Sequence, residues 1–378
     1  RMTATADSLF EALSLTLAAR RLGQTGARPP VGCVVARGGE VIARGATDSD
    51  GRHAEEIALA SLGDSDGDGA AAGAEVFTTL EPCAHEREGG GCAERLARAG
   101  VRRVVYLTGD PDPRTDGRGA EILRRGGVEV VMSDDGERRR EAYCLALGHI
   151  CRVREGRPMV TLKMAASLDG RIAASDVSAG ERRWITGEDA RRRAHLLRSE
   201  HDVVLVGSET VLADDPELTV RLRGWGGCQP LRVVLDTRLR VSPGSVVCRG
   251  GATWIFTRRG ADAGRRAALE ASSGVRVIEV EADGNVLSLP AVLRRLKGEG
   301  YGRVLVEGGG RVASAFLASK FVDMLAWFTA PVFLGAEAAP SIVPPYESDG
   351  NDWKLLDREI HGDDLLSLFL SSRHISQL

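Results

Sequence analysis

Short runs of hydrophobic residues alternate along this chain with stretches of helical spacing, and turn residues separate the two. The first pair of runs, residues 31–36 and 40–43, flanks Gly38-Gly39 and predicts a β-hairpin. The other elements predicted in the first half are helices at 7–21, 53–62 and 92–99, strands at 74–80 and 101–107, and a helix followed by a strand within 121–131. Because strands and helices alternate, we expect a largely parallel sheet in an α/β arrangement.

The pattern is interrupted near the middle of the chain. A polar helix predicted at 137–150 is followed by Gly156-Arg157-Pro158, and a new hydrophobic strand begins at Met159. A chain of 378 residues also exceeds what one hydrophobic core usually serves. We therefore predict two domains, residues 1–152 and 157–378. The elements predicted in the second are strands at 159–163, 203–207, 231–236, 252–257, 275–280 and 303–307, helices at 289–299 and 311–319, and a further element within 322–333.

Composition narrows the classes of function. A net charge of −3 gives no electrostatic reason to expect binding to nucleic acid or to an anionic membrane. An aromatic content of 4% also argues against an aromatic-lined channel for nucleic acid. No apolar run reaches the roughly 18–20 residues that span a bilayer, and the N-terminus lacks the basic and apolar segments of a secretory signal. Seven cysteines, an odd number, do not resemble a disulfide framework. We expect a cytoplasmic protein in which Cys33, Cys144 and Cys151 are buried and inert.

Four residues of the first half carry candidate chemistry. His53, Cys83 and Cys92 supply one imidazole and two thiols, and Glu55 lies two residues after His53. Three protein ligands to zinc leave one tetrahedral position for water, as in catalytic sites rather than structural ones. Glu55 could then take a proton from that water and pass it to a departing amine. The pattern predicts a zinc-dependent deaminase with Glu55 as its catalytic residue.

Three other interpretations stay open. His85 could complete a structural zinc site as a fourth ligand, although structural sites usually draw their ligands from closer pairs. A nucleic-acid deaminase would share the zinc chemistry but would need a basic channel for a flipped base. A scaffold with an inactive deaminase domain is disfavoured, because Glu55 and all three metal ligands are present.

Two sets of motifs resemble a known family over residues 8 to 340. In the first half these are His53-Ala54-Glu55, the run Thr79 to His85 (TLEPCAH), and Cys92. In the second half they are LKMAASLDGR from Leu162, WITG from Trp184 with Ala190-Arg191, VGSETVLADDPELTVR from Val206, VEGGG from Val306 and APVFLG from Ala330. Together they resemble the bifunctional riboflavin-biosynthesis deaminase/reductases. The resemblance implies a cytidine-deaminase-like, three-layer domain followed by a dihydrofolate-reductase-like domain. It also implies deamination of a phosphoribosylated diaminopyrimidinone, then NADPH-dependent reduction of its ribosyl group to ribityl.

The resemblance also implies which residues of the second half form the reductase site. Lys163 would lie at the active site and polarise the sugar oxygen. The positions matching the family's cofactor contacts are Ala165, Trp184, Thr210, Asp214, Thr237, Gly308, Gly309 and Gly310. Those matching its substrate contacts are Arg198, Leu218, Arg221 and Glu307, while Arg182 either adds a phosphate contact or obstructs the site. Simpler alternatives are a tight strand–helix turn for the glycines and surface charges for Lys163 and the arginines.

The deaminase pocket departs from the family pattern. Arg28, in the run Arg28-Pro29-Pro30, replaces an asparagine, Thr47 replaces a histidine, and Ile57 occupies a usually polar position. The loop 84–91 also differs. Since such changes remove groups that could hydrogen-bond a pyrimidine edge, substrate recognition is expected to be altered. The chain is then either a riboflavin enzyme for a small phosphorylated pyrimidine, a paralogue in a secondary azapteridine (toxoflavin-like) pathway, or a reductase with an impaired deaminase. The resemblance further implies a homodimer or higher homo-oligomer.

Overall fold

The structure is a computed structural model that describes residues 6–63, 71–85, 90–173, 184–284, 286–343 and 352–377. These residues form two compact units that divide between Gly156 and Arg157. Within the described part of the chain, every helix is too short or too polar to cross a bilayer.

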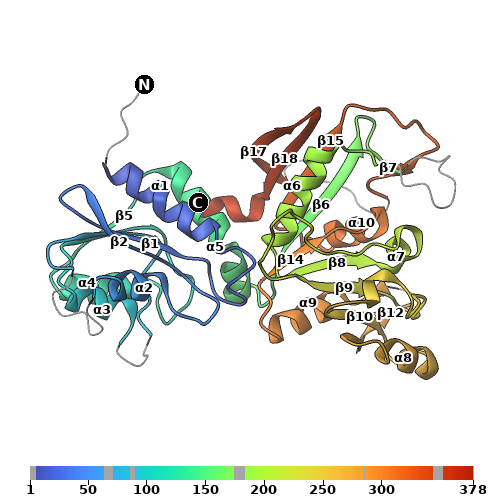
Figure 1. Cartoon of the computed structure of the whole chain (residues 1–378), viewed down its shortest axis with the longest axis horizontal. Helices are drawn as coiled ribbons and strands as arrows, with labels where there is room; N and C mark the ends of the chain where they lie inside the picture. Colours follow the sequence, from blue (N-terminus) through green and yellow to red (C-terminus); the bar gives the residue numbers. More distant parts are fainter. Residues whose placement is uncertain are drawn as a thin grey trace. The chain divides into compact units, whose positions relative to one another are not determined.

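The first unit is a five-stranded sheet between two layers of helices (Figure 1). The strand order is β2 (Glu40–Ala46), β1 (Gly32–Arg37), β3 (Glu75–Leu80), β4 (Arg103–Thr108) and β5 (Glu129–Met132). One face carries α1 (Ala6–Ala19) and α5 (Gly136–Arg154), and the other carries α2 (Ala54–Ala60), α3 (Cys92–Arg98) and α4 (Arg118–Arg125). The predicted hairpin and the predicted helix–strand alternation of this half are confirmed.

The expectation of a largely parallel sheet is wrong for this unit. Strand β1 pairs antiparallel with both β2 and β3, and only the β3–β4 and β4–β5 pairs are parallel. The cause is the hairpin, which reverses the chain at Gly38 and Gly39, both at positive φ (61° and 84°). Because α2 then carries the chain from β2 over β1 to β3, both neighbours of β1 run opposite to it.

The second unit is built on a nine-stranded sheet. Its order is β11 (Val275–Val280), β10 (Thr253–Arg258), β9 (Leu231–Leu235), β8 (Val203–Gly207), β14 (Arg303–Val306), β6 (Met159–Ser167), β15 (Met324–Ala330), β18 (Asp364–Ser371) and β17 (Trp353–His361). The first seven strands in this order, from β11 through β6 to β15, pair in parallel. Strands β18 and β17 are antiparallel additions at one edge. The predicted strands of this half are confirmed, but β17 and β18 were not predicted.

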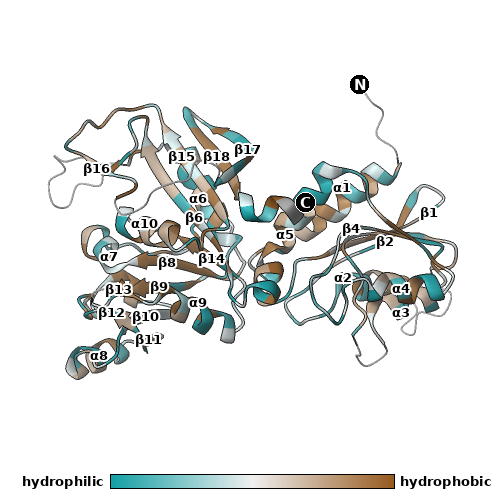
Figure 2. Cartoon of the chain, turned by 180° about the vertical axis from the view of Figure 1, so that it is seen from behind, coloured by the Kyte–Doolittle hydropathy of each residue, from teal (hydrophilic) through white to brown (hydrophobic). Residues whose placement is uncertain are grey.

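Helices cover both faces of this sheet and bury two apolar clusters. Residues of α9 (Leu289–Gly298) and α10 (Gly310–Ala318) pack in one cluster, and residues of α6 (Glu188–Ser199) and α8 (Ala263–Glu270) pack in the other. Figure 2 shows β8 and β9 largely brown between these layers. Helices α6, α8 and α7 (Ser208–Asp214) were not predicted. The remaining short elements are β7 (Arg171–Ala173), β12 (Ala282–Asp283), β13 (Val286–Leu287), β16 (Ala339–Pro340) and the 3₁₀ segments η1 (Val246–Cys248) and η2 (Ser372–Gln377).

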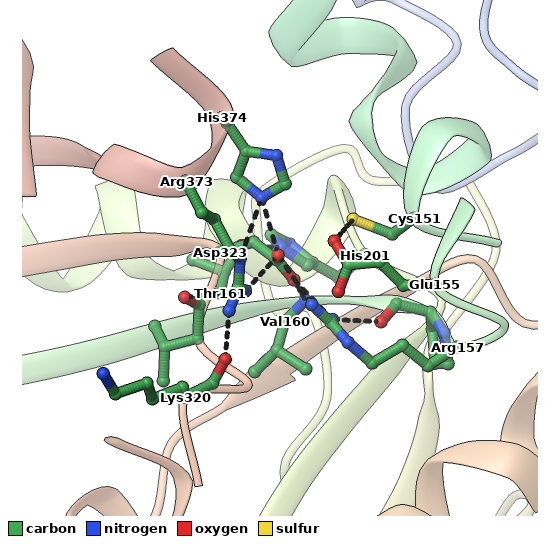
Figure 3. Close-up of polar contacts among 12 residues, drawn as sticks. Cys151, Glu155, Arg157, Val160, Thr161, His201, Lys320, Asp323, Arg373 and His374 are labelled. Carbon is green, nitrogen blue, oxygen red and sulfur yellow. Dashed lines mark hydrogen bonds and ion pairs between the residues drawn. The ribbon is translucent and has the colours of Figure 1, made fainter. Parts of the chain in front are cut away.

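A buried carboxylate, Asp323, joins three parts of the second unit at the start of β15 (Figure 3). Its two oxygens accept hydrogen bonds from Arg157 at 2.7 and 2.9 Å, and its Oδ2 also accepts from the Val160 N–H at 2.8 Å. The η2 segment contributes His374, at 2.8 Å, and Arg373. Asp323 is fully buried; although burial alone would raise its pKa, Arg157 and His374 lower it well below the usual range.

Candidate zinc and reductase sites

Three of the predicted residues meet at one end of the first unit. His53 is the N-cap of α2, Cys83 follows β3, and Cys92 begins α3. The His53 Nδ1 atom lies 3.3 Å from Cys92 Sγ and 3.5 Å from Cys83 Sγ. A zinc ion bound to nitrogen and sulfur at ordinary bond lengths sets these donors about 3.6 Å apart, the edge of its tetrahedron. The three donors therefore fit one zinc ion, with Nδ1 as the imidazole ligand.

Close backbone packing brings these donors together. A side chain at Gly45 on β2 would meet the Ala54 carbonyl at 2.0 Å, so the start of α2 lies directly on the strand. A side chain at Gly91 would likewise meet the Cys83 carbonyl at 2.7 Å. The N–H of Cys92 then donates to Cys83 Sγ at 3.4 Å. Glycine at both positions permits the approach of the ligand-bearing segments.

The two thiols differ in acidity because they share a hydrogen bond. The contact with Cys92 lowers the pKa of Cys83 to about 4, and His53 and the Cys92 N–H act in the same direction. The same contact and burial raise the pKa of Cys92. One thiolate therefore forms readily, and a cation between the sulfurs would replace the shared proton.

Glu55 lies in the first turn of α2 and is 3% exposed. Burial raises the pKa of its carboxyl, while the nearby His53 favours the charged form. A carboxylate that is reluctant to ionise fully is suited to accept a proton and release it again. Its nearest glutamate along the chain, Glu56, is instead paired with Arg52 and Arg95 at 3.8 and 4.0 Å.

His85 does not share the donor cluster. Its ring centroid lies 6.1 Å from that of His53, and the donor cluster that contains His53 has Cys83 and Cys92 as its other described members. The structure thus gives no support to His85 as a fourth ligand. Its Nδ1 is buried without a hydrogen-bond partner in the described part of the chain, so the ring retains a polar atom that could face a ligand.

The departures from the family pattern lie at different depths. The Arg28 guanidinium is exposed and lies over Gly51, where a side chain would meet it at 2.4 Å. Thr47 is buried, and its hydroxyl accepts from the Val31 N–H at 3.2 Å, so it secures the end of β2. Ile57 is half-buried on α2, and residues 86–89 lie outside the described residues. Cys33 and Cys151 are buried as expected, whereas Cys144 is only half-buried because it lies on the partly open face of α5.

A second charged cluster lies in the second unit, at the end of β14. Glu307 binds Arg198 of α6 through two contacts, at 2.6 and 3.1 Å, and lies 3.7 Å from Lys163 Nζ on β6. Burial alone would raise the pKa of Glu307, but Arg198 and Lys163 lower it to about 2. Lys163 is largely enclosed and lies over the Phe328 ring. Neither Lys163 nor Arg198 is a solvated surface charge, and burial lowers the pKa of Lys163.

The three glycines at the start of α10, Gly308 to Gly310, have different surroundings. A side chain at Gly308 would meet Val312 at 2.6 Å, and one at Gly310 would meet the Pro340 carbonyl at 2.9 Å. At Gly309 the first atom met would be Thr210 Oγ1, at 3.9 Å. Gly309 is also the N-cap of α10, where no side chain caps the helix. Two of the glycines are thus required by packing, and open room for an anionic group remains at the third.

The other predicted reductase residues lie on several different elements of the second unit. Ala165 follows Lys163 on β6, Asp214 ends α7, and Thr237 follows β9, where its carbonyl accepts from Thr257. Leu218 is buried at positive φ (56°), and Trp184 is exposed with Arg191 over its ring. Arg221 is exposed and pairs with Glu217, as the surface alternative predicts. Arg182 lies outside the described residues.

His195 was not among the predicted residues, yet it belongs to this cluster. It lies one turn before Arg198 on α6, and its Nδ1 accepts from the Arg221 N–H at 3.3 Å. Burial, together with Arg198 and Arg221, lowers the pKa of His195 to about 4. His195 stands three residues before Arg198, a spacing that places both on one face once the segment is known to be helical.

The chain resembles known proteins over nearly its full length. Residues 158–366 match the family described as the RibD C-terminal domain, and residues 5–108 match the cytidine and deoxycytidylate deaminase zinc-binding region. The riboflavin biosynthesis protein RibD of Bacillus amyloliquefaciens is 38% identical over 87% of this chain and 86% of its own. The chain belongs to the RibD family.

Other RibD proteins agree. That of Escherichia coli is 36% identical over 88% of this chain and 89% of its own. The solved structure of Acinetobacter baumannii RibD, form 1, has a TM-score of 0.81 at 31% identity and covers 98% of this chain and 100% of that chain. A deaminase/reductase from Thermotoga maritima gives 0.80 at 31% identity, covering 97% and 99%. The expected family, the two-part fold and a bifunctional deaminase/reductase of riboflavin biosynthesis are confirmed. The relatives give no support to the secondary-pathway alternative.

Proposed function

We propose that the first unit removes ammonia from a diaminohydroxyphosphoribosylaminopyrimidine and that the second reduces the product, 5-amino-6-(5-phosphoribosylamino)uracil, with NADPH. The Thermotoga maritima relative is named for a deaminase and a reductase acting on these two compounds. The observation that carries the proposal is the arrangement of His53, Cys83 and Cys92 at tetrahedral spacing, beside the buried Glu55.

In the deaminase step a bound zinc ion would supply an acidified water molecule for attack on the amine-bearing carbon. The His53 Nδ1 and the Cys83 and Cys92 sulfurs would hold the ion. Glu55 accepts a proton at its carboxylate and returns it to the departing amine, which its burial and raised pKa favour. Burial of the site also limits access of bulk water to the reacting groups.

In the reductase step NADPH would supply a hydride to the sugar carbon. The residues present fit this cofactor, because Gly309 leaves open room at the uncapped start of α10 and Thr210 lies beside it. Glu307 holds Arg198 and Lys163 in place through its two carboxylate oxygens. Lys163 Nζ is then fixed to donate a hydrogen bond to the sugar oxygen, and Arg198 adds positive charge for a phosphorylated substrate.

A turnover assay with the diaminopyrimidine phosphate tests the proposal. We expect ammonia release without NADPH, and equimolar NADPH oxidation only after deamination has occurred. NADPH oxidation without ammonia would show a reductase with an impaired deaminase. Absence of both reactions in zinc-loaded protein would show that the substrate is another compound.

The cofactor site gives a separate prediction. Gly309→Ala should weaken NADPH binding about tenfold or more, or about 1.4 kcal/mol, because the added methyl group fills the open room at the helix start. The melting temperature should not fall, because the methyl group meets no protein atom closer than 3.9 Å. Fluorescence titration with NADPH measures the affinity.

A matched control is Gly298→Ala, near the end of α9, where a side chain would meet nothing within 4 Å. It should leave the NADPH affinity unchanged, and the melting temperature of the protein unchanged or slightly raised. Unchanged NADPH affinity in Gly309→Ala would remove this loop from the cofactor site.

A further inference from the structure

A network outside the metal donors fixes the segment that carries Cys83. We define the ligand loop as residues 81–84, and the supporting turn as residues 115–120, at the start of α4. The Glu81 side chain is 4% exposed and points into the supporting turn. Its Oε2 accepts from the Gly117 N–H at 3.1 Å, and its Oε1 accepts from the Ala120 N–H at 3.0 Å. Both carboxylate oxygens are therefore used by backbone donors.

The two segments also touch through their backbones. A side chain at Gly119 would lie 1.9 Å from the Pro82 carbonyl oxygen, so only glycine permits this approach. The Ala84 N–H faces Thr115 Oγ1 at 3.5 Å. The Glu81 N–H donates to the Thr108 carbonyl at 2.9 Å, which continues the pairing of β3 with β4. Residues on both sides of Cys83 are thus held by the supporting turn.

The supporting turn is itself rigid. Gly117 is at a φ of 73°, and the N–H groups of Thr115 and Asp116 both donate to the Asp112 carbonyl, at 2.7 and 2.8 Å. Asp110, two residues before Asp112, accepts from His149 of α5 at 2.9 Å. Glu81 therefore fixes the ligand loop against the start of α4, and Asp110, which also accepts from the Asp112 N–H at 2.9 Å, ties the supporting turn to α5.

We infer that Glu81 is a positioning residue of the deaminase, which sets the place of the Cys83 sulfur relative to His53 and Cys92. A carboxylate suits this role because it accepts at both oxygens. A glutamine of the same shape offers one acceptor and turns its NH2 group toward a backbone N–H. Two N–H donors that face each other in a buried site lower the stability of the folded state. The ligand loop of the glutamine variant should therefore shift to separate them.

The inference rests on the proposed zinc site and is tested with the full chain loaded with Co²⁺ in place of zinc. Thiolate coordination gives intense charge-transfer and visible bands that report the ligand geometry. In Glu81→Gln we expect changed band positions or intensities and faster metal loss to a chelator, by about 10- to 100-fold, the usual cost of losing an outer partner of a metal ligand. Reductase turnover, measured on the same sample, should stay at the wild-type level.

Two further variants keep the test decisive. Gly119→Ala moves the Pro82 carbonyl without changing the charge of the site, and it should alter the cobalt spectrum in the same way. This variant keeps the test available if Glu81→Gln does not fold. Glu75→Gln, at the other end of β3, is the matched control and should have the wild-type spectrum.

The outcomes separate two failures. A wild-type chain without thiolate–cobalt bands would contradict the zinc site itself. Wild-type bands with an identical spectrum and identical metal loss in Glu81→Gln and Gly119→Ala would overturn only the role of Glu81. A lowered melting temperature with an unchanged spectrum would show that Glu81 merely stabilises α4, and would also overturn it.

Discussion

Glu55→Gln is expected to lower the rate of ammonia release by about 10²–10⁴-fold, the usual contribution of a positioned acid–base group. Glutamine keeps the shape of the side chain but can neither accept nor return the proton. Because Glu55 is not one of the clustered metal donors, zinc content should stay at the wild-type level. A coupled ammonia assay and elemental analysis of the same preparation measure both quantities.

Glu56→Gln is the matched control for this prediction. Glu56 is the next residue on α2, and it pairs with Arg52 and Arg95 rather than lying among the metal ligands. Ammonia release should be unchanged in this variant. Turnover retained in Glu55→Gln would show that another group moves the proton, and loss of zinc would show that Glu55 acts on the metal instead.

The second large effect is on stability. Asp323→Asn is expected to destabilise the second unit by about 3–5 kcal/mol, because it leaves Arg157 and Arg373 without their buried counter-charge. Urea unfolding followed by tryptophan fluorescence measures the change, and loss of NADPH-dependent turnover along the same curve assigns it to this unit. Asp357→Asn, at an exposed position on β17, should change the free energy of unfolding by less than about 0.5 kcal/mol.

The same variant has a predictable pH dependence. The pKa of Asp323 is lower in the folded chain than in the unfolded chain, where an aspartate has a pKa of about 3.9. Its stabilisation is therefore complete above the unfolded pKa and is lost as the pH falls through the folded pKa. The difference between wild type and Asp323→Asn should be largest at neutral pH and shrink on acidification below about pH 4. A difference that grows with acid would contradict this charge arrangement.

Much of the first unit could be predicted because its signals are local. The hairpin at Gly38-Gly39 and the residues that begin α2 and α3 are visible in the sequence, and so are His53 and Cys92 at the starts of those helices and Cys83 after β3. The antiparallel pairing of β1 with β3 could not be predicted from local signals, because it depends on α2 passing over β1. Nor could the spacing of His53, Cys83 and Cys92 show which imidazole nitrogen faces the sulfurs.

The second unit shows where sequence patterns fail. The Asp323 cluster joins residues from opposite ends of the unit, and no periodicity links Arg157 to His374. Likewise, Lys163 and Arg198 share the buried partner Glu307, so residue spacing alone left each open as a surface charge and only the family resemblance placed them in the site. The hairpin of β17 and β18 was different, since Gly362, at positive φ (64°), is followed by the hydrophobic run 365–370, which was a readable turn and strand signal.

The placement of His53 and Glu55 has a consequence for how the deaminase site would fail. The imidazole of His53 and the carboxylate of Glu55 are separated by one residue at the start of one helix, whereas the two sulfurs come from other segments. Once the contacts between these segments loosen, the sulfurs would therefore move relative to His53, whereas the histidine–glutamate spacing lasts as long as the start of α2. Heat or mild denaturant should therefore release the metal before α2 unfolds, and the protein should recover activity only when it is returned to native conditions with added zinc.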